Sequence, residues 1–134
     1  MRYLLDTNIV SYFVKGVSAS LVQRMQAGVD AQDIAISAVT RAELRYSVEL
    51  MDKFDKRRRR IDLVLKELPT LPWSTEAADE FGRIRAYLKR NGCPVGEFDT
   101  QIAAHALTEK LILVTHNTRH FENVPHLKLE DWMA

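Results

Sequence analysis

Three acidic residues and one amide lie where the sequence could bring metal-binding side chains together. They are Asp6, Glu43, Asp99 and Asn117. Carboxylates held close together repel one another unless a cation neutralises them. Side-chain oxygens, with no Cys or His at the spacing of a zinc site, favour Mg²⁺ or Mn²⁺ over Zn²⁺. The pattern therefore indicates metal-assisted chemistry, provided that the fold gathers these residues in one place.

Asp6 has two interpretations that the N-terminal sequence does not separate. Residues 3–5 form a short apolar run. This run predicts a buried strand with Asp6 at its carboxyl end, the usual position of an α/β active site. A small polar residue among Asp6, Thr7 and Asn8 could instead cap a helix that starts near Ile9. Both interpretations stand equally on this stretch alone.

The other three residues also have purely structural interpretations. Thr40 and Glu43 have the spacing of a capping box at the start of a helix. Asp99 near a helix N-terminus would be favoured by the helix dipole, and the preceding Gly96 would let the backbone approach closely. Asn117 is a common turn residue. None of these features assigns a function by itself.

Apolar runs alternate with helical patterns along the chain, and this alternation predicts how the polar residues are positioned. Short strands are expected at residues 3–5, 34–36, 71–73, 111–115 and, as an edge strand, 127–129. Helices are expected at residues 9–15, from Ser18 or Ser20 to Gly28, from residues 37–40 to 50, over the basic segment up to Pro69, from Ser74 to Asn91, and around Asp99. Polar turns are expected at residues 30–33 and 93–98, and a loop or single turn at 116–121. We predict an α/β/α sandwich with a mostly parallel central sheet, whose strand ends gather at one edge.

Length and composition describe a small protein of a reducing compartment. The 134 residues fit a single domain spanning residues 1–134. The net charge of +1, from 19 basic and 18 acidic residues, excludes an argument for nucleic-acid binding from overall charge. The single cysteine, Cys93, cannot form an internal disulfide, and no segment reads as a membrane span or a signal peptide. We therefore expect a cytoplasmic protein.

Positive charge is concentrated in residues 53–60. The cations are Lys53, Lys56, Arg57, Arg58, Arg59 and Arg60. This segment could bind RNA phosphate or an acidic partner, but a charge run is more often a solvated helix face. His116 and His120 would share a helical face, yet no third ligand lies near them in sequence, so zinc is not predicted.

Four motifs in order give the sequence a family resemblance. They are Leu5-Asp6-Thr7-Asn8, Thr40-x-x-Glu43-Leu44, Gly96-x-x-Asp99-x-x-Ile102-Ala103-Ala104-x-Ala106, and Leu113-Val114-Thr115-x-Asn117-x-x-x-Phe121. Together they resemble a PIN domain and, more closely, the VapC ribonuclease toxins of bacterial toxin–antitoxin pairs. The resemblance runs from Met1 to Trp132, essentially the whole chain.

The resemblance implies a metal-dependent endoribonuclease with Asp6, Glu43 and Asp99 as catalytic acids and ligands of Mg²⁺, or of Mn²⁺. Such a cation would polarise a phosphodiester and lower the pKa of a bound water. In-line attack by that water would leave a 5′-phosphate and a 3′-hydroxyl. Thr7, Asn8 and Thr115 are then candidates for positioning Asp6 or the phosphate. If these roles are right, the folded protein brings the six residues close together.

The last motif departs from the family pattern. Many PIN domains have an Asp where this chain has Asn117, and related toxins that share the Asn often have an acid where this chain has His120. Asn117 would complete the catalytic set with a neutral oxygen, and His120 could contact phosphate. Neither side chain is a carboxylate, so one metal site is expected rather than two.

The resemblance also implies partners. These are an RNA substrate, with initiator tRNA plausible, and a cognate antitoxin whose tail occupies a groove near the site. A toxin homodimer and a higher toxin–antitoxin assembly are implied as well. Three aromatic residues, Tyr12, Phe13 and Tyr46, are candidates for the walls of that groove.

Two other functions remain open from the residues. A phosphatase with Asp6 as nucleophile would usually carry Asp-x-Asp, and Asn8 at the second position counts against it. A PIN fold that serves only as an assembly or regulatory protein would lack chemistry, and the retention of Asp6, Glu43 and Asp99 argues against that function. Absence of a phosphoenzyme and growth arrest abolished by Asp6→Asn would favour the nuclease over both.

Overall fold

A five-stranded sheet forms the centre of the protein, in a computed structural model that describes residues 1–134. The strand order is β3-β2-β1-β4-β5. The strands are β1 (Tyr3–Leu5), β2 (Ile34–Ser37), β3 (Thr70–Leu71), β4 (Ile112–Val114) and β5 (Leu129–Glu130). Every pairing between neighbouring strands is parallel. The prediction of a mostly parallel sheet is confirmed.

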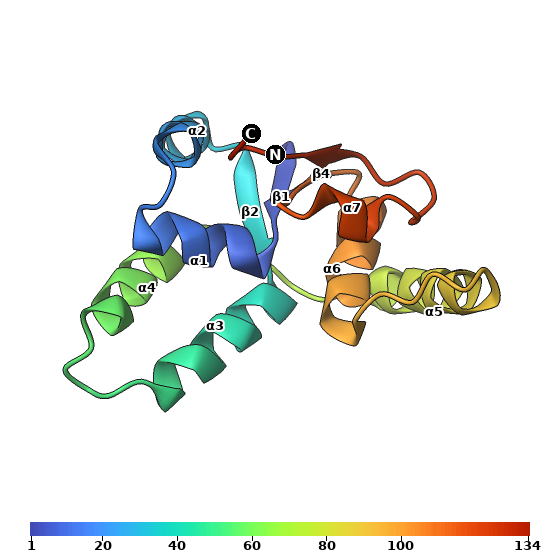
Figure 1. Cartoon of the computed structure of the whole chain (residues 1–134), viewed down its shortest axis with the longest axis horizontal. Helices are drawn as coiled ribbons and strands as arrows, with labels where there is room; N and C mark the ends of the chain where they lie inside the picture. The colour runs from blue at the N-terminus through green and yellow to red at the C-terminus, as the bar shows by residue number, and fades with distance from the viewer.

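Seven helices cover the two faces of this sheet (Figure 1). They are α1 (Thr7–Lys15), α2 (Ala19–Ala31), α3 (Ala38–Leu50), α4 (Lys56–Glu67), α5 (Thr75–Arg90), α6 (Glu97–Thr108) and α7 (Thr118–Phe121). Leu5, Ile36 and Val114 point into the core beneath α1 to α4. Leu4 and Leu113 point into the second core, beneath α5 to α7. Because successive strand residues face opposite ways, the two cores lie on opposite faces, and the predicted α/β/α sandwich is confirmed.

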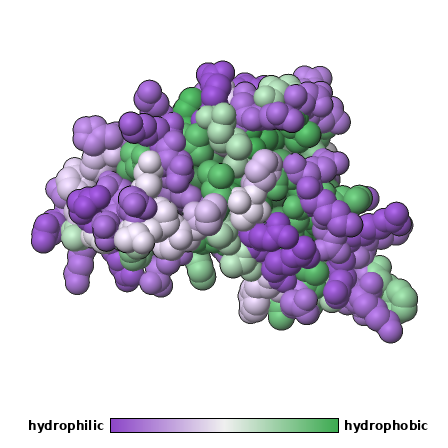
Figure 2. All heavy atoms as spheres, turned by 180° about the vertical axis from the view of Figure 1, so that it is seen from behind, coloured by the Kyte–Doolittle hydropathy of each residue, from purple (hydrophilic) through white to green (hydrophobic).

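The surface of the molecule is polar at both ends of its long axis. Figure 2, seen from behind, shows hydrophilic atoms at the left and right ends and hydrophobic atoms gathered over the middle. No helix combines the length and apolar character needed to cross a membrane.

Serine residues cap three of the long helices. Ser18, Ser37 and Ser74 each accept a hydrogen bond from a backbone N–H of the first turn. Ser18, rather than Ser20, therefore begins α2. Because Ser37 caps α3 and Thr40 lies buried inside that helix, the capping-box interpretation of Thr40 and Glu43 is wrong.

Gly28 lies inside α2 and does not end it as predicted. The helix continues to Ala31, through the first half of the expected turn at residues 30–33, and Gln32 forms its C-cap with φ 56°. A Cβ atom at Gly28 would lie 2.5 Å from Cγ2 of Ile34. The glycine therefore permits a close approach between α2 and β2.

Several element boundaries differ by small shifts from the sequence prediction. The first helix begins at Thr7 rather than Ile9, and the basic helix begins at Lys56. The short edge strands lie at Thr70–Leu71 and Leu129–Glu130, each displaced from its predicted range. Such shifts are expected where short strands depend on their neighbours for hydrogen bonds.

The carboxyl ends of β2, β1 and β4 are level with one another. Ile36 and Val114 both pair with Leu5 in register. The next residue along each strand is therefore Ser37, Asp6 or Thr115. In Figure 1, α1, α3 and α6 all begin near this edge of the sheet. The parallel topology thus brings distant polar residues to one edge, as an open α/β fold requires.

Candidate active site

Asp6 is held at the junction between β1 and α1. It is 4% exposed, and its Oδ1 accepts a hydrogen bond of 2.7 Å from the N–H of Ile9. The backbone N–H of Asp6 donates to the carbonyl of Val114 at 3.0 Å. Both interpretations of Asp6 therefore hold in part, because the residue ends a buried strand and also caps the following helix.

The electrostatic surroundings of Asp6 disfavour its ionised form. The pKa of this carboxyl is raised to about 6, mainly by burial and to a smaller extent by the charges of Asp99 and Glu43. Hydrogen bonds from the Thr115 hydroxyl and the Ile9 N–H act in the opposite direction on this pKa. A cation beside Asp6 would relieve the repulsion and favour the carboxylate.

Glu43 is tied to α1 through Thr7. The Thr7 hydroxyl donates to Oε1 of Glu43 at 2.7 Å, and the hydroxyls of Thr7 and Thr40 are hydrogen bonded at 3.1 Å. Thr40 is fully buried. Glu43 on α3 is therefore held close to the turn that begins with Asp6, and the Thr7 hydroxyl contacts this carboxylate. A role for Thr7 toward Asp6 or a phosphate stays a prediction.

Asp99 lies in the first turn of α6 and meets His120 of α7. Nε2 of His120 is 2.9 Å from Oδ2 of Asp99. The expected close approach at Gly96 is wrong, because a Cβ there would make only an ordinary contact, 3.9 Å from Asp99 Oδ2. The position of Asp99 at the helix start agrees with the prediction.

Asn117 and Thr115 follow β4 and have different environments. Thr115 is fully buried, and its Oγ1 accepts a hydrogen bond of 3.1 Å from the backbone N–H of Asn117. The Asn117 side chain is exposed and forms no hydrogen bond with any of the three acids. The structure thus brings Thr115 to Asp6 and leaves the Asn117 amide outside the contacts among the acids.

The two histidines of the last motif do not form a pair. Nδ1 of His116 lies 3.1 Å from Oδ2 of Asp131, whereas His120 contacts Asp99. The side chain of His120 therefore lies beside Asp99, at the position where related toxins often carry an acid. The contact between His120 and Asp99 joins residues from two separate sequence motifs. The only sign of this contact in the sequence is that His120 replaces an acid of the family pattern.

The donor set suits a hard divalent cation. Asp6, Glu43 and Asp99 offer carboxylate oxygens, and the charges of Glu43 and Asp99 both raise the pKa of Asp6. No group of three or more His, Cys, Asp or Glu side chains is close enough to hold a metal directly. Mg²⁺ commonly keeps several waters and contacts few carboxylates. The arrangement therefore fits a cation held partly through water.

A cavity of about 550 Å³ opens beside the acids. It is lined by Thr7, Asn8, Ser11, Ala42, Glu43, Tyr46, Ser47 and Phe98. The side chain of Asn8 is exposed, so this residue is accessible to a ligand. Its substrate-positioning role stays a prediction. Tyr46 and Phe98 are exposed as well. Tyr12 and Phe13 are instead half-buried against the core, so of the three predicted groove residues only Tyr46 is exposed. Their place in an antitoxin groove stays a prediction.

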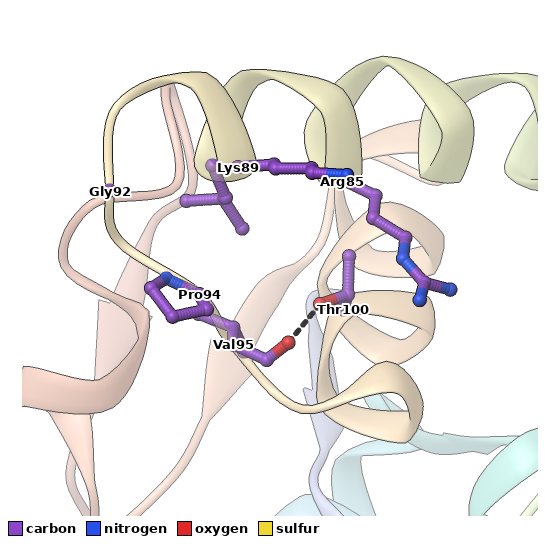
Figure 3. A pocket seen from close by; sticks show the side chains of 7 residues that line it. Arg85, Lys89, Gly92, Pro94, Val95 and Thr100 are labelled. Atoms are coloured by element: carbon purple, nitrogen blue, oxygen red, sulfur yellow. Dashed lines mark hydrogen bonds between the residues drawn. The ribbon is translucent and has the colours of Figure 1, made fainter.

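A second cavity lies between α5 and α6, on a different part of the surface (Figure 3). Its volume is about 470 Å³, and its cations are Arg85 and Lys89. The Thr100 hydroxyl donates to the carbonyl of Val95 across its wall at 3.3 Å. None of the predicted site residues lines this cavity.

The basic segment forms the start of α4, and two of its cations are engaged locally. Arg57 forms an ion pair of 2.6 Å with Asp55, which lowers the pKa of that carboxyl to about 2. Arg58 donates to the carbonyl of Met51 at 2.9 Å. A role for residues 53–60 in RNA binding stays a prediction.

Comparisons with known proteins agree with this architecture. A family model described as PIN domain matches residues 3–127. The chain is 39% identical to the tRNA(fMet)-specific endonuclease VapC of Shigella flexneri, over 98% of each protein. It is 38% identical to the Ribonuclease VapC2 of Haemophilus influenzae, over 99% of each.

Two solved structures of complexes have the same fold. VapBC2 from Rickettsia felis, bound to a DNA fragment from its promoter, matches with a TM-score of 0.89 and 32% identity, over 98% of this chain and 99% of that one. DNA-bound VapBC from Salmonella typhimurium matches with a TM-score of 0.84 and 34% identity, over 98% of both chains. The resemblance found in the sequence is confirmed, and the chain belongs to the PIN-domain family and, within it, to the VapC ribonucleases.

Proposed function

We propose that this protein is a divalent-metal-dependent endoribonuclease whose acids are Asp6, Glu43 and Asp99. The observation that carries the proposal is the buried Asp6 at the end of β1, whose pKa is raised to about 6 by burial and by the two other acids. Such a site is stabilised by a cation. Its oxygen donors favour Mg²⁺, with Mn²⁺ as the alternative.

Each residue of the site has a defined task in this proposal. Asp6 and Asp99 would hold the cation, and Glu43 would do so partly through water. When bound, the cation polarises a phosphodiester and makes a nucleophile of water at neutral pH. Thr7 holds Glu43 in place, and Thr115 supports Asp6.

The remaining residues act around these acids. The N–H of Asn117 keeps the Thr115 hydroxyl in position at 3.1 Å, so Asn117 acts through its backbone as well as offering a side-chain oxygen to the solvent side. Asn8 faces the cavity beside Glu43 and can bind substrate. Cleavage leaves a 5′-phosphate and a 3′-hydroxyl.

RNA cleavage by matched variants tests the proposal. We expect the wild type to cleave RNA in the presence of Mg²⁺ and to stop when EDTA is added. Asp99→Asn is expected to abolish cleavage. Glu97→Gln is the control, because Glu97 lies in the same helical turn but pairs with Arg85 at 3.1 Å. Undiminished cleavage by Asp99→Asn, or equal loss in both variants, would reject the assignment.

We infer that tRNA is the substrate class, with initiator tRNA as the first candidate. A relative with 39% identity is named as a tRNA(fMet)-specific endonuclease, and this supports the inference. Mapping the 5′ ends of RNA cleaved after brief induction tests it. Fragments from initiator tRNA are expected in the wild type and absent in Asp6→Asn, and cleavage confined to messenger or ribosomal RNA would overturn the inference.

We propose that the chain acts as a toxin neutralised by a cognate antitoxin, and that it forms a homodimer within a larger assembly. The similar structures from Rickettsia felis and Salmonella typhimurium are VapBC complexes, which supports an antitoxin partner. Growth arrest on expression, lost in Asp6→Asn and relieved by the antitoxin, tests the toxin role.

We propose also that residues 1–134 form one domain, because both cores pack against the same sheet. Light scattering is expected to give twice the mass of the 15.4 kDa chain. Unfolding is expected in one cooperative transition. The mass of a monomer would contradict the homodimer, and two separate unfolding transitions would contradict the single domain.

A further inference from the structure

Two exposed aromatic side chains line the cavity beside the acids. Tyr46 of α3 is 66% exposed and Phe98 of α6 is 56% exposed. We propose that this cavity, the aromatic pocket, binds a nucleobase of the RNA substrate next to the cleaved phosphodiester. Tyr46 and Phe98 supply its stacking surfaces. This inference rests on the proposed ribonuclease function.

Each wall of the aromatic pocket adjoins one of the acids. Tyr46 follows Glu43 by three positions on α3, so both residues lie on the same face of the helix. Phe98 directly precedes Asp99, and Thr7 directly follows Asp6. A nucleotide whose phosphate lies at the acids therefore has its base within reach of the pocket.

The chemistry of the pocket suits a nucleobase. Single-stranded RNA is recognised by splayed bases that stack on aromatic side chains and form hydrogen bonds along their edges. Asn8, Ser11 and Ser47 place polar groups in the same cavity as the two rings. The volume of about 550 Å³ lies within the usual range for small-ligand sites.

Positive charge continues from the aromatic pocket. A smaller adjoining cavity of about 190 Å³ shares Ser11 and Ser47 with it and is lined by Lys15 and Arg57. Arg57 is paired with Asp55, whereas Lys15 forms no ion pair with any acid. An acid and two aromatic rings line one cavity, and a free cation lines the adjoining one. This combination suits a polyanionic strand better than an acidic or apolar peptide.

Binding of short single-stranded RNA oligonucleotides that carry one 2-aminopurine tests the inference. The protein carries Asp6→Asn to prevent cleavage, and Asn keeps the capacity to cap α1. Stacking is expected to quench the fluorescence of the probe at one position of the strand. Tyr46→Leu and Phe98→Leu are each expected to weaken binding about tenfold and to remove the quenching.

Aromatic replacements separate stacking from apolar burial. Tyr46→Phe and Phe98→Tyr are expected to keep both the affinity and the quenching, because each retains a ring. Phe54→Leu is the control, since Phe54 is 83% exposed and lies outside the pocket. Because all three aromatic side chains are exposed, these variants are expected to fold, which circular dichroism checks.

Three outcomes separate failure of this inference from failure of the proposed function. Leu variants that bind and quench like the parent overturn the aromatic pocket as a base site. Leu variants that keep RNA affinity but lose dimer mass in light scattering assign the pocket to protein contact and also overturn it. A wild-type protein that neither binds nor cleaves RNA instead overturns the ribonuclease proposal.

Discussion

The Nε2 atom of His120 lies 2.9 Å from the Oδ2 atom of Asp99, across 21 residues of sequence. A carboxylate accepts hydrogen bonds only, so in this contact the imidazole nitrogen donates. His120 therefore orients one of the three acids, at the position where related toxins often carry an acid. At this position the structure places a hydrogen-bond donor to Asp99.

Replacing His120 is expected to weaken metal binding. Groups that orient a metal-binding carboxylate typically contribute about 10–100-fold in affinity. We expect His120→Ala to weaken Mn²⁺ binding about tenfold in calorimetry. His116→Ala is the control, because His116 contacts Asp131 instead. Equal Mn²⁺ affinity in His120→Ala and wild type would show that the contact does not position Asp99 for metal.

Replacing Asp6 is expected to stabilise the metal-free protein while abolishing cleavage. Its pKa of about 6 lies above the ordinary 3.8, so the folded state holds this proton more tightly than the unfolded state. That contribution to stability is present below pH 3.8 and is lost as pH rises through about 6. Near neutral pH in EDTA, Asp6→Asn should raise the free energy of unfolding by about 1–3 kcal/mol.

Urea denaturation with and without Mn²⁺ measures this effect of Asp6. Asp79→Asn is the control, because Asp79 is an exposed acid on α5. Mn²⁺ should stabilise wild type and the Asp79 variant more than Asp6→Asn. A metal-free Asp6→Asn protein that is less stable than wild type would contradict the electrostatic account of the site.

Removing the Thr7 hydroxyl is expected to release Glu43. Thr7→Val keeps the shape of the side chain but loses the 2.7 Å hydrogen bond to Glu43. We expect about a tenfold fall in the cleavage rate and a loss of about 1 kcal/mol in the free energy of unfolding. Thr75→Val, at the matching first position of α5 and exposed, should cleave at nearly the wild-type rate. Equal rates in wild type and Thr7→Val would remove Thr7 from the site.

The sheet and most helices could be predicted from the sequence because their signals are local. The apolar runs, the capping serines and Gly16 each act within a few residues. Gly16 caps α1 in the left-handed conformation, at the end of the helix predicted for residues 9–15. Contacts across the fold could not be read in this way. The pairing of His120 with Asp99, and the shared cavity of Tyr46 and Phe98, depend on how α6 lies against α7 and α3.

The incorrect predictions also arise from contacts between elements that are distant in the sequence. Thr40 and Glu43 matched a capping box, but Ser37 lies closer to the strand end and caps the helix first. Gly28 was predicted to end α2, whereas its role is set by Ile34 in the neighbouring strand. A local pattern with two explanations is resolved only by tertiary packing.

Two glycines on the helices make a matched pair for testing that packing. Gly28→Ala places a Cβ atom 2.5 Å from Ile34, and overpacking of this kind typically costs about 1–3 kcal/mol. Gly82 lies in α5, and a Cβ atom added there would have nothing within 4 Å, so Gly82→Ala should stabilise by about 0.5–1 kcal/mol. Thermal unfolding of both variants measures the difference. A Gly28 variant as stable as the Gly82 variant would contradict the tight contact.

His105 is expected to make the protein sensitive to acid. It is fully buried, and its Nδ1 lies 2.8 Å from the Ser37 hydroxyl while its Nε2 has no partner. Burial lowers the pKa of this imidazole below its ordinary 6.5, against the smaller opposing effect of Glu109.

The unfolded chain therefore binds this proton more readily, and the folded state loses stability as pH falls below 6.5. Between about pH 7 and 5 the wild type should lose stability relative to His105→Gln, measured as the difference between their free energies of unfolding. The contribution of Asp6 has the opposite sign, but it is present in both proteins and cancels in their difference. His126→Asn is the control because His126 is exposed with φ 66°, a conformation that Asn tolerates. Parallel pH profiles for wild type and His105→Gln would show that the buried imidazole is not the acid-sensitive group.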